Sequence, residues 1–354
     1  MEREGVHMLR RDISTALLAT ATGAALLPKS ATAQTCTAPC YAQTAAEITA
    51  GITPVNTSYP PLWADRYGTN TTPGTTNMAT AIQNAIKVAA VAGATGNTGM
   101  GVILQATTYL VNSTIVIPGG VTVRGAGGSG VGVGSTTGIG TNILFTGVEG
   151  TAAFCLGNSN AALSYFPALA DLAITLATTT GGTWGVQFLC SVNGSARNIF
   201  VFSNPALVNS GFLISGGTAA SGVSCFFNTL TNCYAQHVYE GYAFNSLAAG
   251  NTEATQTTFL QCAALGLGDT TGYGLVFAQP GQGYASGFHG CYFENFGTGV
   301  YFNTTNSVNF YGTQFEGCGN DIAWSGSDQA VTFFGLYAPT QTGTPGTACG
   351  VLNG

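Results

Sequence analysis

Hydrophobic and polar residues alternate in the same order in three stretches of the chain, which superimpose without a gap. Each stretch opens with an apolar–polar strand pattern, has a small or polar residue about halfway and ends in an aromatic residue. The stretches are Cys233–Phe244 (CYAQHVYEGYAF), Cys291–Phe302 (CYFENFGTGVYF) and Thr313–Trp324 (TQFEGCGNDIAW). From Cys291 to Thr313 the offset is 22 residues, a spacing typical of solenoid repeats. Strands at this period, with no helical pattern between them, predict the coils of a parallel β-helix.

Segments with the same kind of ending indicate further coils. Successive endings, marked by their first Gly or Asp, lie 26, 30, 33, 25 and 22 residues apart. The predicted strands are Val102–Leu104, Tyr109–Val111, Thr114–Ile117, Val121–Arg124, Trp184–Leu189, Gly211–Ile214, Gly241–Phe244, Gly274–Phe277, Gly299–Phe302 and Asp321–Trp324. The longer intervals indicate loops inserted at one corner of the coil, so 215–224, 246–256 and 266–273 are candidate walls of a binding cleft.

The segment before the strands has helical periodicity. Residues 34–64 read as an irregular lead-in, whereas Thr75–Ala92 places Ile82, Ala85, Ile86 and Ala89 at helical spacing. Thr76 or Asn77 can cap its start and Gly93 can end it. A helix at this point would cover the open end of the solenoid core, where strand edges would otherwise be exposed.

The N-terminus has the features of an export signal. Arg10-Arg11 precede a mildly apolar run, Ile13–Leu27, and the small-x-small sequence Ala31-Thr32-Ala33 follows. The pattern resembles a twin-arginine signal, and an ordinary secretory signal is the alternative. The run is too short and too polar to span a membrane. The chain thus divides into a signal peptide (1–33), a lead-in with capping helix (34–94), a parallel β-helix (95–337) and a C-terminal tail (338–354), and we expect a periplasmic or secreted protein.

The composition limits the classes of partner that the protein could bind. Charged residues make up only 6% of the chain, the formal net charge is −6 and Lys occurs twice. Clusters of Lys and Arg that neutralise phosphates are missing, which excludes a nucleic-acid partner in this interpretation. Of the ten cysteines, Cys36 and Cys40 could bridge each other, whereas Cys233 and Cys291 share a repeat position and are expected to stack as small buried residues.

No cofactor is expected. Cysteine and histidine do not occur at the spacing of a zinc site, which excludes that class of metal centre. Gly125–Gly130 (GAGGSG) fits the dinucleotide fingerprint, but the sequence after it cannot start the helix that the fingerprint requires.

The segment before and around the first strands carries a family resemblance. It starts with ADRYG at Ala64, continues through TAIQNAIKVAA and runs on as GVILQATTYLVNSTIVIPGGVTVRGAG. This order resembles the opening of the pectate-lyase-superfamily, polygalacturonase-related proteins, which implies a right-handed parallel β-helix that binds or cleaves polysaccharide. The resemblance covers residues 64–130 by motif and the later coils by pattern. The polygalacturonase catalytic motifs are missing; Phe288-His289-Gly290 is the nearest echo of one, so no catalytic residue carries over.

The repeats themselves bring two carboxylates together. We predict a column of Gln236, Gln261, Glu294 and Glu316, one residue per coil. Neighbouring strands lie about 4.8 Å apart, so Glu294 and Glu316 would be roughly 5 Å apart, which resembles the carboxylate spacing of retaining glycoside hydrolysis. Phe293 and Phe315 would point inward, and the Glu residues therefore outward. The alternative is that these residues only decorate a polar surface.

Other residues could assist this pair. The candidate catalytic residues are Glu294, Glu316 and His289, and the candidate substrate-binding residues are Gln236, His237, Glu240, Gln261 and Tyr292. Tyr239 and Tyr242, beside Glu240, could stack on a sugar. The leading hypothesis is an exported glycosidase or lyase that acts on a plant or microbial polysaccharide. The alternatives are a non-catalytic carbohydrate-binding or surface β-helix and a phage-tailspike-like depolymerase, which the export signal disfavours.

Overall fold

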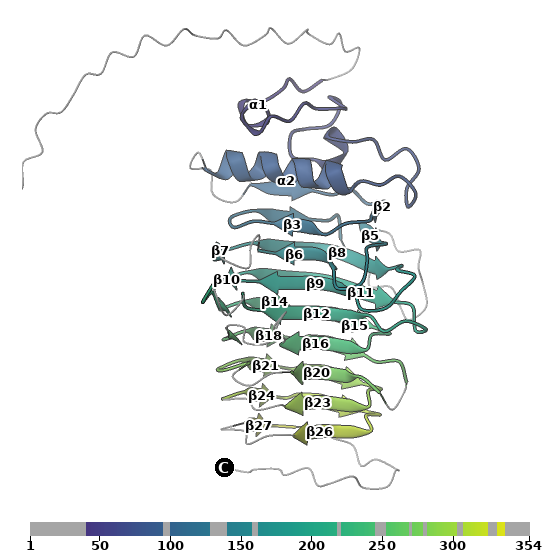
Figure 1. The fold of residues 1–354 in the computed structure, drawn as a ribbon, viewed down its shortest axis with the longest axis vertical. Coiled ribbons are helices and arrows are strands. Elements are labelled where there is room, and N and C mark those ends of the chain that lie inside the picture. Colours follow the sequence, from purple (N-terminus) through teal and green to yellow (C-terminus); the bar gives the residue numbers. More distant parts are fainter. Residues whose placement is uncertain are drawn as a thin grey trace, which may run out of the picture. The chain divides into compact units, whose positions relative to one another are not determined.

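The computed structural model describes residues 40–94, 100–127, 140–157, 162–217, 221–244, 253–268, 271–278, 282–302, 307–324 and 331–336. The strands in these ranges pair in parallel and form a right-handed parallel β-helix, as the repeats and the resemblance predict. Figure 1 shows successive coils stacked below helix α2 (Ala79–Ala94). The predicted signal peptide, Cys36 and the predicted C-terminal tail lie outside the described residues, as do 218–220, 246–252 and 269–270 of the predicted cleft walls.

Three sheets make up the coils. Sheet A contains β1 (Gly101–Ile103), β2 (Thr108–Val111), β4 (Thr122–Arg124), β5 (Asn142–Phe145), β8 (Ala168–Leu176), β11 (Ser195–Ser203), β14 (Thr229–Thr231), β15 (Tyr234–Gln236), β18 (Thr258–Leu260), β19 (Ala263–Leu265), β21 (Gly287–His289), β22 (Tyr292–Glu294), β24 (Asn309–Tyr311), β25 (Gln314–Glu316) and β27 (Thr332–Phe334). Sheet B contains β3 (Ile115–Ile117), β6 (Ala152–Leu156), β9 (Trp184–Leu189), β12 (Ser210–Ser215), β16 (Glu240–Phe244), β20 (Tyr273–Phe277), β23 (Thr298–Phe302) and β26 (Asn320–Trp324). Sheet C contains β7 (Ser164–Tyr165), β10 (Ser191–Val192), β13 (Cys225–Phe226) and β17 (Ala254–Thr255).

Sheet A bends along a line of residues in the left-handed region. Asp171, Asn198, Asn232 and Gln261 have φ values of 59°, 53°, 50° and 52°, and glycines occupy this position in the later coils. Asn and Asp tolerate this backbone conformation better than most residues. The side chains also bond to one another: Asn232 donates to Asn198 at 2.9 Å and Asn198 donates to Asp171 at 2.7 Å. The bend divides each coil of sheet A into two short strands with separate outer faces.

Stacked aromatic rings fill the interior of the C-terminal coils. Phe244, Phe277 and Phe302 are fully buried, and successive ring centroids lie 4.9 and 5.2 Å apart. Their alignment, coil by coil, confirms the register of the three repeats. Cys233 and Cys291 are buried in one column as predicted, and Cys262 lies between them.

A compact cap covers the first coil. Helix α2 has buried apolar residues along one side, and Gln83 exchanges hydrogen bonds with the backbone of Val116 in β3. The lead-in is not irregular throughout: it contains α1 (Ala45–Ala50) and the short helix η1 (Ala64–Arg66). Thr44 and Glu47 form a reciprocal capping box that fixes the start of α1. None of the helices in the described residues is long and apolar enough to cross a membrane.

Candidate functional site

The two predicted carboxylates lie in one column on the outer face of the second half of sheet A. Glu294 in β22 pairs with Glu316 in β25, and the residues before them, Phe293 and Phe315, are fully buried in the core. Because side chains alternate along a strand, both Glu side chains point outward. Glu294 is half-buried and Glu316 is exposed. The predicted stacking of Glu294 on Glu316 is confirmed.

Tyr292 joins the two carboxylates. Its hydroxyl lies 2.8 Å from Oε2 of Glu294 and 2.8 Å from Oε2 of Glu316. Burial and these two carboxylate contacts raise the pKa of the Tyr292 hydroxyl, so it keeps its proton. One hydroxyl proton can serve only one acceptor at a time. The hydroxyl therefore donates to either Glu294 or Glu316 and holds both carboxyl groups beside one side chain.

Gln236 occupies the predicted column, but Gln261 does not. Gln236 pairs with Leu265, and Leu265 pairs with Glu294. Gln261 instead lies at the bend of sheet A, where its backbone is left-handed and its side chain is exposed. The apolar residue Leu265 therefore stands in the column where we expected a polar one. The placement of Gln261 in the column is wrong.

The amide of Gln236 is buried without a partner. The residue is only 1% exposed, and neither its Oε1 nor its Nε2 has a hydrogen-bond partner. A buried amide without a partner is costly, of the order of 1–3 kcal/mol. Tyr234, two residues before it, lies on the same outer face, and burial together with the negative charge of Glu294 raises the pKa of its hydroxyl. The face between β15 and β22 therefore combines an unsatisfied amide, two tyrosines and a carboxylate.

Neither predicted histidine contacts the carboxylates in the described hydrogen bonds. His289 is in the first half of sheet A, on the other side of the bend at Gly290. It is exposed, and its ring stacks on Tyr311 at 4.7 Å. His237 forms the corner between β15 and β16 with a φ of 55°, and its backbone N–H donates to Leu265.

Glu240 belongs to a different surface, the outer face of sheet B. It begins β16, pairs with Tyr273 and accepts a hydrogen bond from Ser210 at 3.3 Å. Burial raises the pKa of Glu240 to about 6, and the Ser210 hydrogen bond only partly offsets this effect. Tyr239 packs edge-on against Tyr273 with ring centroids 6.1 Å apart, so aromatic rings adjoin the carboxyl. Tyr242, which we expected at the surface, is fully buried in the core and is corrected here.

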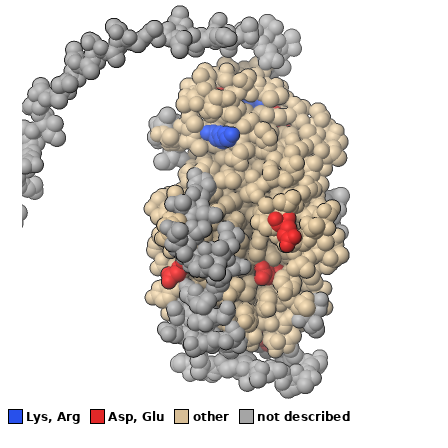
Figure 2. Space-filling view, viewed as in Figure 1, with Lys and Arg blue, Asp and Glu red and all other residues tan. Residues whose placement is uncertain are grey.

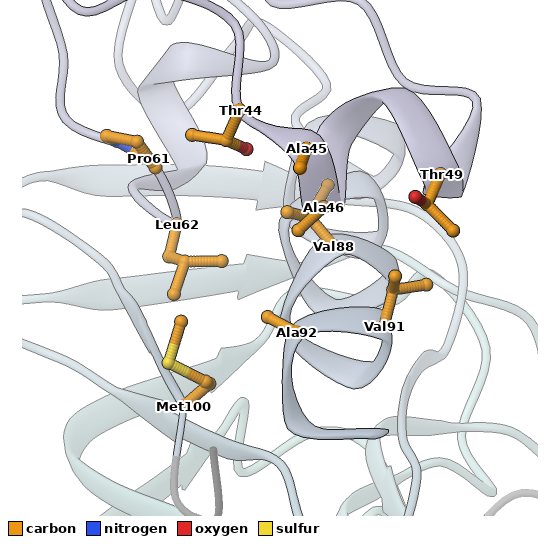
Figure 3. Close-up of a pocket in the computed structure, with 10 residues that line it drawn as sticks. All are labelled: Thr44, Ala45, Ala46, Thr49, Pro61, Leu62, Val88, Val91, Ala92 and Met100. Carbon is orange, nitrogen blue, oxygen red and sulfur yellow. The ribbon is translucent and has the colours of Figure 1, made fainter. Parts of the chain in front are cut away.

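The cap contains a pocket, but the described residues that line it have no titratable side chain. Figure 3 shows it between α1, α2 and the start of β1, with a volume of about 360 Å³. Its lining is mostly apolar, including Leu62, Val88, Val91 and Met100, and its only side-chain hydroxyls come from Thr44 and Thr49. None of the described residues that line this pocket has a charged side chain, so the outer face of sheet A is the stronger candidate site.

Charge is sparse elsewhere, which makes the paired carboxylates distinctive. Figure 2 shows only a few separate red and blue side chains among the tan residues of the face in view. Across the ranges that the structure describes, no group of three or more His, Cys, Asp and Glu side chains could hold a metal ion. Two features of the sequence point to the site: the Glu pair, and the Tyr in the second position of the Cys-Tyr repeats. The first was used, but Tyr234 was missed although it aligns with Tyr292.

Comparisons with known proteins concern the fold. No family model matches the chain, and no curated protein matches it. Among solved structures, it is similar to the phiAB6 tailspike in complex with oligosaccharides of Acinetobacter baumannii surface polysaccharide (16% identity, TM-score 0.44, 75% of this chain and 46% of that chain). It is also similar to ORF18 of Geobacillus virus E2 (17%, 0.42, 77% and 61%) and to the A-module of mannuronan C-5 epimerase AlgE6 from Azotobacter vinelandii (15%, 0.38, 75% and 77%).

This chain therefore spans about three fifths of the Geobacillus virus protein and less than half of the tailspike. The identities are all low, and the β-helix assignment rests on the strand pairing of the chain itself.

Proposed function

We propose that this chain is an exported polysaccharide-active protein that cleaves a glycan on the outer face of sheet A. The observation that carries the proposal is the Tyr292 hydroxyl, which contacts the carboxylates of both Glu294 and Glu316. Two neighbouring carboxyl groups can divide the roles of acid and of base or nucleophile between them. Gln236 and Tyr234 lie on the same face and supply hydrogen-bonding groups for sugar hydroxyls.

The chemistry follows from the spacing. The two contacting oxygens each lie 2.8 Å from one hydroxyl, so they are at most twice that distance apart. This separation fits a retaining hydrolysis, in which carboxyl groups about 5–5.5 Å apart flank the bond. The protonated carboxyl donates its proton to the glycosidic oxygen as the carbon–oxygen bond breaks, while the ionised carboxylate bonds to the anomeric carbon. Water, deprotonated by the first carboxylate, then releases the sugar and restores both groups.

A lyase would use the same residues differently. The ionised carboxylate would remove a proton next to the uronate carboxyl, and the protonated one would donate to the leaving oxygen as a carbon–carbon double bond forms. The two reactions have different products: hydrolysis releases reducing ends alone, whereas elimination also forms an unsaturated uronate that absorbs in the ultraviolet.

The test incubates the purified protein with a panel of plant and microbial glycans and follows reducing ends and ultraviolet absorbance together. Replacing both carboxyls (Glu294→Gln with Glu316→Gln) is expected to lower the rate by about 100-fold or more. Glu149→Gln, which changes an exposed carboxyl in the loop between β5 and β6, should leave the rate unchanged. Activity that survives the double substitution would overturn the assignment of this site. Binding of a glycan that the protein never cleaves would instead support a carbohydrate-binding module.

A further inference from the structure

A second charged cluster lies in the N-terminal coils. Arg124 in β4 and Arg197 in β11 both pair with Ala170 in β8, so the two arginines flank one position of the column. Both guanidinium groups contact Oδ2 of Asp171: Nε of Arg124 at 2.8 Å and a terminal nitrogen of Arg197 at 3.4 Å. The other carboxylate oxygen, Oδ1, accepts from Asn198 at 2.7 Å. Asp171 thus holds two arginines side by side on adjoining coils.

The arginines of this cluster have positive charge and hydrogen-bond donors left over for a ligand. The Asp171 side chain is only 11% exposed, whereas those of Arg124 and Arg197 are 58% and 56% exposed. One carboxylate balances one of the two positive charges and leaves the other uncompensated. Each guanidinium has five N–H donors, of which the contact with Asp171 uses only a part. Only four Lys or Arg residues occur in the described ranges, and half of them meet here.

The cluster and the candidate site are linked by the strand order. Arg197 shares β11 with Phe202, and Phe202 lies in the column that continues through Gln236 and Leu265 to Glu294. Arg197 and Glu294 are therefore three coils apart, roughly 14 Å along the helix axis at one strand spacing per coil, and they lie on opposite sides of the bend in sheet A. A glycan that reaches from one to the other spans several sugar units.

We propose that Arg124 and Arg197 bind an acidic group of the glycan, a carboxylate or a sulfate ester, at a position remote from the bond that reacts. The inference rests on the proposed function only in taking the ligand to be a polysaccharide. Paired guanidinium groups match the planar geometry of a carboxylate and present several parallel donors to a sulfate. Their partner Asp171 fixes both side chains before the ligand arrives, which lowers the entropy lost on binding.

The position of the arginines along the β-helix suits them to anchor the polymer away from the reacting bond. They lie too far from Glu294 and Glu316 to touch the same sugar, so they contribute to affinity and alignment of the chain. Remote binding of this kind positions a polymer for reaction at another point. Loss of the arginines should therefore weaken substrate binding much more than it slows the step at the two carboxylates.

The experiment measures binding to polygalacturonate, dextran sulfate and uncharged dextran, with the Glu294→Gln/Glu316→Gln variant so that no polymer is degraded. An acidic polymer should bind more tightly than dextran, and raising NaCl from about 0.05 to about 0.5 M should weaken that binding. The polymer that binds identifies the acidic group as a carboxylate or a sulfate. Arg124→Gln with Arg197→Gln should weaken acidic-polymer binding by about tenfold or more and abolish the salt dependence.

Lys87→Gln is the matched control, because Lys87 is an exposed cation on α2, away from this column. It should leave binding unchanged. Equal binding of dextran and both acidic polymers, or no binding of either acidic polymer, would overturn the proposal. These measurements do not need a folded arginine variant, since the salt dependence is read on the chain that keeps both arginines. A protein that binds acidic polymer but cleaves no glycan would refute the catalytic proposal and leave this one standing.

Discussion

Two ion pairs in this molecule use the same chemical groups in opposite ways. In the cap, Arg66 and Glu47 are both 0% exposed, and the guanidinium also donates to the carbonyl oxygens of Tyr41, Ala42 and Tyr59. Tyr67 adds a hydrogen bond to Glu47 at 2.8 Å. In the coils, Asp171 is nearly buried, but the arginines that contact it are more than half exposed.

The difference separates the groups that build the fold from those that are available to a ligand. The hydrogen-bonding groups of Arg66 and Glu47 are all used within the protein. Because both side chains are buried, losing any of these contacts would destabilise the fold. The coil arginines, the amide of Gln236 and the two carboxylates around Tyr292 all retain capacity that the protein does not use. These arginines, this amide and these carboxylates all belong to strands of sheet A.

The largest expected effect is on the cap pair. Arg66→Met leaves the Glu47 carboxylate buried without its cation, so it should lower the free energy of unfolding by about 3–5 kcal/mol. Arg197→Gln removes one exposed partner of Asp171 and should lower the free energy of unfolding by only about 1 kcal/mol or less. Chemical denaturation of both variants beside the parent protein measures the contrast. Equal losses would mean that the two ion pairs do not differ as burial implies.

The raised pKa of Glu240 should make the free energy of unfolding depend on pH. Its pKa is raised by burial from 4.5 to about 6, so the folded protein holds a proton there that the unfolded chain releases. The stability that this proton provides is complete below pH 4.5 and is lost as the pH rises through 6, a change of about 2 kcal/mol. Glu240→Gln cannot titrate, so its unfolding free energy should lack this decline. Parallel pH profiles of the parent protein and Glu240→Gln would contradict the burial of the carboxyl.

A smaller and opposite effect is expected at Gln236. Gln236→Leu removes two buried polar atoms that have no partner, so it should raise the free energy of unfolding by about 1 kcal/mol. If the amide binds a sugar hydroxyl, the same change should weaken glycan binding. Thr313→Val is a matched control, since it also removes a buried unpaired oxygen but lies in the core column of the cysteines. Improved stability with unaltered glycan binding would make Gln236 a defect of packing rather than part of the site.

The sequence predicted the coils well because inward positions repeat strictly. Phe244, Phe302 and the residues that align with them must fill one shared core, and this requirement is visible as a fixed aromatic ending. The helix α1 was missed although Thr44 and Glu47 show the spacing of a capping box, because six residues are too few to give a hydrophobic period.

Outward positions were harder to predict, since solvent tolerates many side chains there. Leu265 occupies the column between Gln236 and Glu294, and the nearest polar residue, Gln261, was taken for it. The stacking of Glu294 on Glu316 could be predicted because both follow an inward Phe. The contact of Tyr292 with both carboxylates could not, because it depends on how the side chains lean across the strands.

The most direct test of the central claim is the rate of glycan cleavage by Tyr292→Phe, on whichever glycan of the panel the parent protein cleaves. The substitution keeps the ring and removes only the hydroxyl that contacts Glu294 and Glu316. We predict a loss of about 100-fold in kcat with an unchanged melting temperature, whereas Tyr234→Phe, which contacts neither carboxylate directly in the described hydrogen bonds, should alter mainly KM. A Tyr292→Phe protein with the parent's kcat would contradict the claim that the Tyr292 hydroxyl makes the two carboxyl groups work as a pair.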